Sequence, residues 1–350
     1  MLALHLGLSE ISKGLIVPML LRSGMQTTVV CDEPIKDYEL NVLGLRRELV
    51  SGFSCLAKDS PSLPKLAQDA QLIVLDESFA QDLANMMQLV SWLSKAEQAP
   101  YLLCFDAGYR LKEMLARQGC EGTVINAFAS RRVFVKSPEL LDVENYFALV
   151  ASRAELDGSR LYIEGLSSAD SLDEFYEAQL FSFDLAQAAC AYIGLVAGHE
   201  SVKEALNDSE VKAVVLGALD ESIKALEARY LRSFETEKEL ALKRLMDEHI
   251  NEDLLTLSSS PLRKLGASER IFGPIYATFE HKLGNENLAL IVAASLCCRN
   301  NDDSETAVLT QRINQQGVFV FLDRQSNLDP KSEFSLRVAR LYERMLLGDF

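Results

Sequence analysis

Short apolar runs alternate with amphipathic stretches of helical length through residues 1–150, and this alternation constrains the fold more than any other feature. The apolar runs are LALHL (2–6), TTVVC (27–31), LIVL (72–75), YLLCF (101–105) and TVINAF (123–128). Between them, ELNVLGLRRELV (39–50) and SFAQDLANMMQLVSWLSKA (78–96) carry apolar residues at helical spacing. Buried strands separated by helices form a parallel, doubly wound α/β sheet. We therefore predict such a domain over residues 1–160.

The chain changes character after IEGLSSADS (163–171), where a glycine and a Ser/Asp cluster interrupt the apolar period. Beyond this point apolar residues recur at three- and four-residue spacing, which is the pattern of packed helices. The pattern runs through residues 175–198, 209–231, 236–250 and 287–298. GVFVFL (317–322) is the one late run that has the composition of a strand. We predict an all-α domain over residues 165–350.

The formal net charge of −16 argues against a general nucleic-acid or anionic-membrane surface, because phosphate binding depends on Lys and Arg. The charge leaves room for a local basic pocket that holds one phosphate. The seven cysteines include no CxxC or Cys/His metal spacing, so we predict reduced thiols and no metal.

The N-terminal sequence MLALHLGLSE has no basic region ahead of an apolar core, so it does not predict a signal peptide. No apolar run of the sequence approaches the roughly 20 residues that span a bilayer. On these grounds we expect a cytoplasmic protein without membrane contact.

The helical half of the sequence resembles, in order and spacing, the C-terminal domain of the mannitol-1-phosphate 5-dehydrogenases, within the polyol-specific long-chain dehydrogenase family. The segments that carry the resemblance are LFSFDLAQAACAYIGLVAGHESVKEAL (180–206), SEVKAVVLGALDESIKALEARY (209–230), PLRKLGASERIFGP (261–274), NLALIVAASL (287–296) and the tail NLDPKSEFSLRVARLYERML (327–346). Upstream, LALHLGLSEISKGLIVPMLLRSG (2–24) resembles the family's opening strand, turn and helix. The resemblance implies a Rossmann-type domain followed by a helical domain. It also implies transfer of a hydride between NAD and a sugar-alcohol carbon.

The family's catalytic helix carries a Lys, an Asn five residues on and a His three residues further, on one face of the helix. The Lys takes the alcohol proton, and the other two orient the substrate oxygen and stabilise its charge. Carried over to this chain, these positions are Gln179, Asp184 and Gln187, and none of them matches. Gln179 cannot titrate, and Asp184 places a negative charge where an alkoxide would develop. Asp184 would be a weak substitute for the base at neutral pH, because an unperturbed Asp has a pKa of about 4.

The family's phosphate loop reads Gly-x-Gly-x-x-Gly-x-Gly, and the corresponding turn of this chain is GLSEISKG. Gly7 and Gly14 match, whereas Ser9 and Ser12 replace the two middle glycines. The first middle glycine lets the backbone approach the pyrophosphate, and the second lets the helix pack closely on the strand. The added Cβ atoms therefore predict weak binding of NAD or none.

Two neighbouring features of the first domain support this prediction. Glu10 adds a negative charge beside the turn, and Pro18 should kink or delay the helix that follows it. The family's ribose-binding acidic residue falls on Cys31 or on its neighbour Asp32, so the sequence leaves ribose recognition open.

Further carboxylates follow the run LIVL, where the family has a small loop that contains glycine. Asp76 and Glu77 stand there in this chain, and both would repel a pyrophosphate at close range. The family's Glu-Asn pair near the nicotinamide becomes Asp106 and Ala107.

Arg263, Lys264 and Arg270 in PLRKLGASER form the best basic cluster for a phosphate or carboxylate of a substrate, with salt bridges to acidic neighbours as the alternative. Together these substitutions predict a relative of the mannitol-1-phosphate dehydrogenases that has lost dehydrogenase activity and serves a binding or regulatory role. Its partner would be a sugar phosphate or a protein. The alternative is an active NAD-dependent oxidoreductase on a polyol or sugar phosphate.

Overall fold

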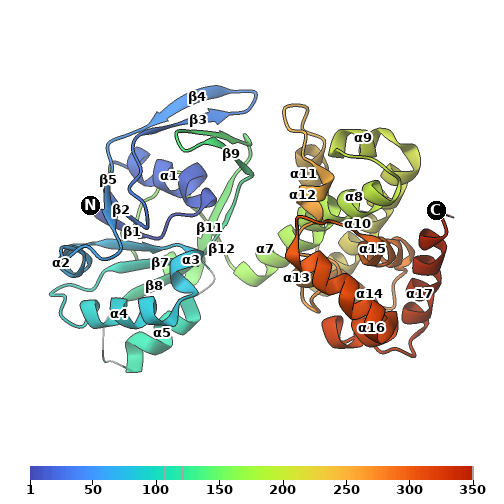
Figure 1. Cartoon of the computed structure of the whole chain (residues 1–350). Helices are drawn as coiled ribbons and strands as arrows, with labels where there is room; N and C mark the ends of the chain where they lie inside the picture. The colour runs from blue at the N-terminus through green and yellow to red at the C-terminus, as the bar shows by residue number, and fades with distance from the viewer. Residues whose placement is uncertain (106–107, 118, 120–121, 349–350) are drawn as a thin grey trace. The chain divides into compact units, whose positions relative to one another are not determined.

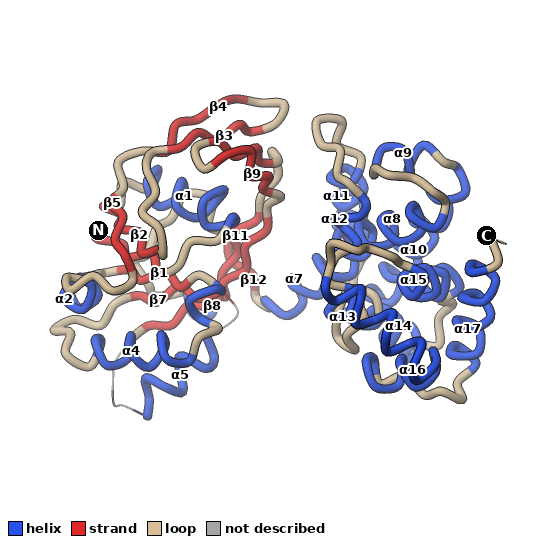
Figure 2. Tube along the Cα trace, viewed as in Figure 1, coloured by secondary structure: helices blue, strands red, loops and turns tan. Residues whose placement is uncertain are grey.

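The computed structural model describes residues 1–105, 108–117, 119 and 122–348 of the chain. The chain divides into two compact units, Met1–Asp173 and Glu174–Phe350. Figure 1 shows the chain coloured by residue number, and Figure 2 shows that the strands of the described residues belong to the first unit while the second is built from helices.

An eight-stranded sheet forms the centre of the first unit. Its strand order is β12-β11-β8-β7-β6-β1-β2-β5, and only the pair β8 and β11 is antiparallel. The strands are β1 (Leu2–Leu6), β2 (Gln26–Cys31), β5 (Ser54–Ala57), β6 (Leu72–Leu75), β7 (Tyr101–Phe105), β8 (Thr123–Ser130), β11 (Ala148–Ser152) and β12 (Ser167–Ala169). The five apolar runs predicted as strands are β1, β2, β6, β7 and β8, so this part of the prediction is confirmed.

Successive side chains of each strand point to opposite faces of the sheet, so both faces are apolar. Helices pack on each of them. On one face, Leu4 and Leu6 of β1 pack in one apolar cluster with Leu89 of helix α4 (Leu83–Leu93). On the other face, Ala3 packs with Leu15 of the first helix. The helices are η1 (Ser12–Ile16), α1 (Val17–Arg22), α2 (Leu63–Asp69), α3 (Glu77–Ala80), α4 (Leu83–Leu93), α5 (Gly108–Arg117) and α6 (Arg153–Leu156). The Rossmann-like, doubly wound architecture is therefore confirmed.

A second, four-stranded sheet corrects one prediction. Its order is β4-β3-β10-β9, with β3 (Tyr38–Val42), β4 (Arg46–Val50), β9 (Val133–Ser137) and β10 (Leu140–Val143). The prediction of a helix over 39–50 is wrong, because this segment is the antiparallel hairpin of β3 and β4. Leu40, Val42 and Val50 are buried in a shared cluster, and Gly44 takes the positive φ of +71° in the turn between the strands.

The second unit is helical, as predicted. Its helices are α7 (Leu172–Gln179), η2 (Leu180–Asp184), α8 (Leu185–Val196), α9 (Val202–Asn207), α10 (Ser209–Tyr230), α11 (Glu235–Leu245), α12 (Leu254–Ser258), α13 (Pro261–Lys264), α14 (Phe272–His281), α15 (Glu286–Cys297), α16 (Ser304–Ser326) and α17 (Glu333–Leu346). Helices α8, α10 and α15 form the centre of the main core. Small side chains such as Ala189 and Ala293 are fully buried there and let these helices approach closely.

The predicted late strand GVFVFL is wrong, because residues 317–322 belong to α16. Gly317 interrupts the helix with φ 76° and ψ 163°, and Phe321 and Leu322 beyond it are buried. A lone strand among helices would leave its N–H and C=O groups without partners, whereas a helix satisfies them internally.

One apolar helical run, Leu172–Val196, is long enough to cross a membrane by length and composition. The prediction that no run approaches this length is therefore wrong on those two criteria. The helix is a core element of the folded unit, however, because 72% of its apolar window is buried inside the structure.

Candidate functional site

The turn between β1 and the first helix, residues 7–14, is the nucleotide turn of the predicted dinucleotide site. Gly7 has a φ of +92°, and a Cβ added to it would lie 2.7 Å from Cβ of Asp76. A Cβ on Gly14 would lie 2.4 Å from Val133 of β9. Both matching glycines are therefore needed for local packing, independently of any ligand.

Asp76, at the end of β6, lies against this turn and is 1% exposed. Its Oδ2 accepts hydrogen bonds from the backbone N–H of Ser9 at 3.0 Å, from the Ser9 hydroxyl at 2.5 Å and from the Ser12 hydroxyl. Its Oδ1 accepts from the N–H of Ser78 at 3.0 Å and from its hydroxyl at 2.6 Å. We call these four residues the Asp76 network. The two serines that replace the family's glycines are thus bound to the carboxylate that follows LIVL.

The network fixes Asp76 in its charged form. Burial alone would raise the pKa of this carboxyl, but hydrogen bonds from Ser12, Ser78 and Ser9 lower the pKa to about 2. In dinucleotide sites, the N–H groups of this turn and the start of the following helix bind the pyrophosphate anion. Here the carboxylate of Asp76, an anion of the chain itself, accepts the hydrogen bond from the N–H of Ser9.

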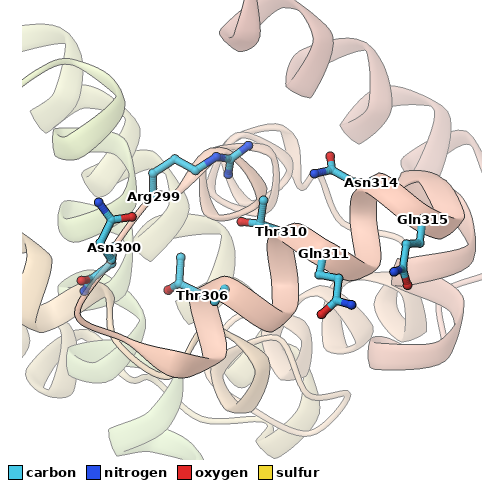
Figure 3. Close-up of a pocket in the computed structure, with 9 residues that line it drawn as sticks. Arg299, Asn300, Thr306, Thr310, Gln311, Asn314 and Gln315 are labelled. Atoms are coloured by element: carbon cyan, nitrogen blue, oxygen red, sulfur yellow. The ribbon is translucent and has the colours of Figure 1, made fainter.

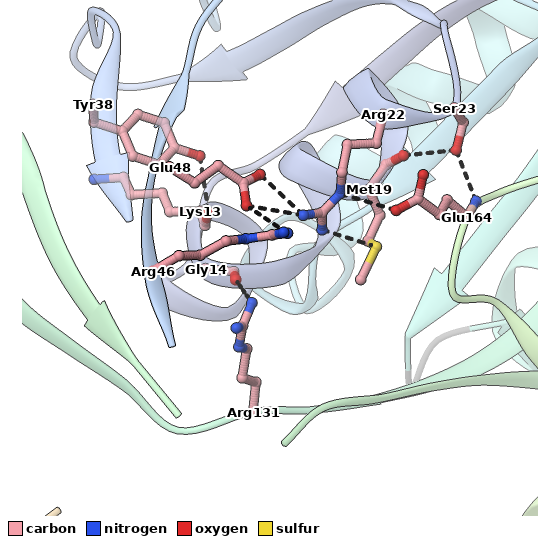
Figure 4. A network of polar contacts seen from close by, with 10 residues as sticks. All are labelled: Lys13, Gly14, Met19, Arg22, Ser23, Tyr38, Arg46, Glu48, Arg131 and Glu164. Atoms are coloured by element: carbon pink, nitrogen blue, oxygen red, sulfur yellow. Dashed lines mark hydrogen bonds and ion pairs between the residues drawn. The ribbon is translucent and has the colours of Figure 1, made fainter. Parts of the chain in front are cut away.

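The helix that follows the turn accommodates Pro18 through a π turn, η1, in which the N–H of Val17 donates to the carbonyl of Ser12. Pro18 has no N–H to donate to the carbonyl of Gly14 four residues earlier. Arg131 donates from Nη1 to this carbonyl at 2.8 Å (Figure 4). Burial, with the neighbouring Arg22, lowers the pKa of Arg131 to about 10. The expected disturbance of the helix at Pro18 is therefore present, and an arginine satisfies the freed carbonyl.

Of the other residues predicted around the cofactor, Asp32 directly follows β2, the strand whose Val30 carbonyl accepts the N–H of Gly7 at 3.0 Å. The Asp32 side chain is 79% exposed and pairs with Lys58 at 2.9 Å, while Cys31 before it is buried. Glu10 is exposed, and Glu77 begins α3. Asp106 and Ala107 lie outside the described residues.

The predicted catalytic positions lie on one continuous helix formed by α7, η2 and α8. η2 is a π turn between Gln179 and Asp184, in which the N–H of Leu185 donates to the carbonyl of Leu180. A π turn closes bonds five residues apart, so it brings residues at this spacing to the same side of a helix. Nε2 of Gln179 accordingly donates to Oδ1 of Asp184 at 3.3 Å.

Two arginines approach this Gln179–Asp184 pair. Nη1 of Arg244, from α11, donates to Oε1 of Gln179 at 3.3 Å, and its guanidinium lies 3.7 Å from the centre of the Phe183 ring. Nη1 of Arg270 lies 3.7 Å from Oδ2 of Asp184. The pair is thus held between two guanidinium groups.

The third predicted catalytic position is Gln187 on α8. Its Nε2 donates to both carboxylate oxygens of Glu252 at 3.1 Å. Sequence reasoning missed both Glu252 and Arg244, which are separated by 65 positions from the residues they bind. No local signal distinguishes them from other charged residues of the helical half.

The three residues of the predicted basic cluster have different partners in the structure. Arg263 is exposed, and its backbone N–H donates to Glu305. Lys264 is buried, and its amine donates to the carbonyls of Leu257 at 2.5 Å and of Ser259. Burial, with Arg270 and Arg263 nearby, lowers the pKa of Lys264 to about 8. Within the described part of the chain, Arg270 alone of the three contacts the Gln179–Asp184 pair.

A separate pocket of about 550 Å³ lies beside α16. Amides and hydroxyls line it together with Arg299, and Figure 3 shows Arg299, Thr310 and Asn314 directed toward the same space. None of the sequence-predicted site residues lines this pocket. Among the described residues we also find no group of three or more His, Cys, Asp or Glu side chains that could hold a metal ion.

Residues 171–345, half of the chain, match the family model for the mannitol dehydrogenase C-terminal domain. The fold is similar to that of a D-sorbitol dehydrogenase in substrate-free form, with a TM-score of 0.76 at 12% identity over 99% of this chain and 93% of that one. It is equally similar to Pseudomonas fluorescens mannitol 2-dehydrogenase in a ternary complex with NAD and D-mannitol, with a TM-score of 0.76 at 14% identity over 99% and 92% of the two chains. A D-mandelate dehydrogenase matches less well, with a TM-score of 0.51 at 9% identity over 89% of this chain and 99% of that one.

Proposed function

The chain belongs to the mannitol dehydrogenase family, and from this premise we propose that it is a cytoplasmic member that no longer transfers hydride and serves a binding or regulatory role. Its polyol dehydrogenase-like fold covers the whole length of the chain. The proposal concerns what the substituted residues do within that fold.

The Asp76 network is the observation that carries the proposal. A bound pyrophosphate requires free N–H groups at the nucleotide turn, and the N–H of Ser9 already donates to Asp76. Binding would also bring two anions together, because the low pKa of Asp76, about 2, keeps this carboxylate charged at neutral pH. We therefore expect NAD to bind weakly or not at all.

The substituted catalytic positions of the helical unit also support the loss of hydride transfer. Gln179 occupies the position of the family's base, but a carboxamide is not basic at neutral pH and cannot accept the alcohol proton. Its oxygen accepts a hydrogen bond from Arg244, and its nitrogen donates one to Asp184. Asp184 forms an ion pair with Arg270, and its carboxylate stands where an alkoxide would develop. Loss of a general base alone costs about 10² to 10⁴ in rate.

The binding role rests on the guanidinium groups of Arg244 and Arg270. Nε of Arg270 is buried and lies 3.6 Å from Oε2 of Glu269, but within the described residues it has no hydrogen-bond partner. A phosphate or carboxylate oxygen would supply that partner. We therefore favour a sugar phosphate over a neutral polyol as the ligand of the helical unit, with a protein partner as the alternative.

An active oxidoreductase on a polyol or sugar phosphate, of the mannitol-1-phosphate 5-dehydrogenase type, is the second candidate. The lowered pKa of Lys264, about 8, favours it, because such an amine can serve as a base near neutral pH. Against it, two backbone carbonyls already hold this amine.

Calorimetric titration with NAD and NADH, together with an NADH absorbance assay on mannitol 1-phosphate and fructose 6-phosphate, tests the proposal. We expect turnover below about 10⁻³ of a typical dehydrogenase rate of about 10 s⁻¹. Turnover near one per second, or a dissociation constant for NAD in the low micromolar range, would contradict it. Asp76→Asn with Ser9→Gly and Ser12→Gly is the matched variant, and NAD binding that appears only in this variant would identify the network as the cause.

A further inference from the structure

Two cysteine side chains meet at the edge of the eight-stranded sheet, on the neighbouring parallel strands β2 and β5. The register pairs Val29 with Cys55 and Cys31 with Ala57, so both cysteines lie on the same face of the sheet. Their Sγ atoms are 2.9 Å apart. Since sulfur atoms in a disulfide are about 2.0 Å apart, these two need to approach by less than about 1 Å.

The two thiols differ in their access to solvent. Cys31 is 6% exposed, and its Sγ donates to the carbonyl of Glu33 at 3.0 Å. Burial, with the contact to Cys55, raises the pKa of the Cys31 thiol to about 12. Cys55 is half-buried on the edge strand. A reagent from solvent therefore reaches the sulfur of Cys55 first.

We propose that Cys31 and Cys55 are a site of reversible oxidation, at which a small-molecule disulfide such as oxidised glutathione converts the two thiols to a disulfide. In the first step the Cys55 thiolate attacks one sulfur of the reagent and releases one thiolate. In the second step the sulfur of Cys31 attacks that of Cys55, and its proton passes to the second departing thiolate. The protein loses two hydrogen atoms, and the reagent is reduced to two thiols.

The bond would close a loop through residues 32–54, which carries the hairpin of β3 and β4. It would also tie the edge strand β5 to β2, whose ends are already joined by the ion pair of Asp32 and Lys58. Cross-links stabilise chiefly by restricting the open chain, so oxidation should slow local opening of this hairpin.

The other described cysteines, Cys104, Cys190, Cys297 and Cys298, do not form such a pair across neighbouring strands. Cys104 and Cys190 are buried in different units, and burial raises the pKa of each thiol to about 12. Cys297 is half-buried at the end of α15, and burial raises its pKa to about 11. Cys297 is therefore the matched control, because it is half-buried like Cys55 and its neighbouring cysteine is the buried Cys298 that follows it in the chain, not one on an adjacent strand.

The experiment is incubation of the reduced full-length protein with oxidised glutathione, followed by alkylation with iodoacetamide, digestion and mass spectrometry. We expect a linked peptide pair that joins Cys31 to Cys55 and lacks two hydrogen atoms, with Cys297 alkylated. Cys31→Ser should stop at a glutathione adduct on Cys55, whereas Cys55→Ser should leave Cys31 alkylated without an adduct. Cys297→Ser should not change the yield of the linked pair.

Two results would overturn the proposal. The first is full alkylation of Cys31 and Cys55 after equilibration with oxidised glutathione. The second is an adduct on Cys31 in the Cys55→Ser variant, which would reverse the assigned order of attack. Hydrogen exchange of residues 38–50 provides an independent readout, for which we expect slowing of about tenfold or more on oxidation. Equal exchange in both states would refute the proposed effect on the hairpin. None of these outcomes depends on whether the protein binds NAD.

Discussion

The nucleotide turn of the first unit and the Gln179–Asp184 pair of the second both lie at a π turn of a helix, yet they differ in how their carboxylates are satisfied. Both oxygens of Asp76 accept hydrogen bonds from serines, and the residue is 1% exposed. The Asp184 side chain is 23% exposed and has an ion pair of 3.7 Å with Arg270. The first carboxylate is enclosed by its partners, whereas the second is partly open.

This difference shows two ways in which a family site changes within a preserved fold. Around Asp76, substituted residues bind one another, so the donors that a ligand would need are already used. Around Asp184, the substituted residues bring in arginines, and Nε of Arg270 has no hydrogen-bond partner among the described residues. Retained ligand binding is therefore expected in the second unit, and structural stabilisation in the first.

The largest effect should follow the change Asp76→Ala. This change removes the acceptor of Ser9, Ser12 and Ser78, and it leaves the hydroxyl of the fully buried Ser12 and the donors of the half-buried Ser9 without that partner. We expect the free energy of unfolding of the first unit to fall by about 3 kcal/mol, since an unpaired buried polar group costs about 1–3 kcal/mol. Urea denaturation followed by circular dichroism measures this loss. Asp32→Ala, at an exposed ion pair, is the control and should change stability by less than about 0.5 kcal/mol. An equal loss in both variants would remove the distinction.

Arg244→Ala tests how far the second site also stabilises its unit. Arg244 is 4% exposed, stacks on Phe183 and binds Gln179. We expect a loss of about 2 kcal/mol in the free energy of unfolding, from lost packing and from the unpaired Gln179. Arg270→Ala should lower the free energy of unfolding by about 1 kcal/mol. Its contact with Asp184, at 3.7 Å, is longer than the 3.3 Å contact of Arg244 with Gln179, and Arg270 is less buried than Arg244. If Arg270→Ala were the more damaging change, the second site would be as closed as the first.

The pH dependence of stability should separate the two carboxylates. Asp76 has a folded-state pKa of about 2, below its ordinary value of 3.8, so its stabilisation is present above about pH 4 and is lost as the pH falls toward 2. The shift corresponds to about 2 kcal/mol. We expect this contribution to be missing in Asp76→Asn and unchanged in Asp184→Asn, as measured by thermal unfolding between pH 5 and pH 2. Identical acid profiles of the wild type and Asp76→Asn would contradict the assignment.

Gln187→Ala should have the smallest effect. Its amide donates to the carboxylate of Glu252 in a partly buried place, and loss of one such contact costs about 1 kcal/mol. Gln311→Ala on the exposed side of α16 is the matched control and should leave stability unchanged within about 0.5 kcal/mol. Chemical denaturation of both variants compares the two losses. A loss of about 3 kcal/mol in Gln187→Ala would mean that this position is as tightly built in as Asp76.

The sequence by itself determined the two-part architecture, because the apolar period of each half follows from local geometry. Five strands of the sheet and the helices α8, α10, α11 and α15 could be predicted from spacing alone, whereas α16 could not. The family positions Gln179, Asp184 and Gln187 could also be located, since the helix that carries them is continuous.

Tertiary structure alone decided three other features. The segment 39–50 has a helical apolar pattern but forms a hairpin, because it pairs with β10 over a shared core. The π turn at η2 closes a backbone hydrogen bond across five residues and brings the amide of Gln179 to 3.3 Å from the carboxylate of Asp184. Ser9 and Asp76 are 67 positions apart, and only the parallel pairing of β1 with β6 brings the carboxylate to the turn. Sequence spacing reports periodicity within one element, whereas such contacts depend on which elements become neighbours.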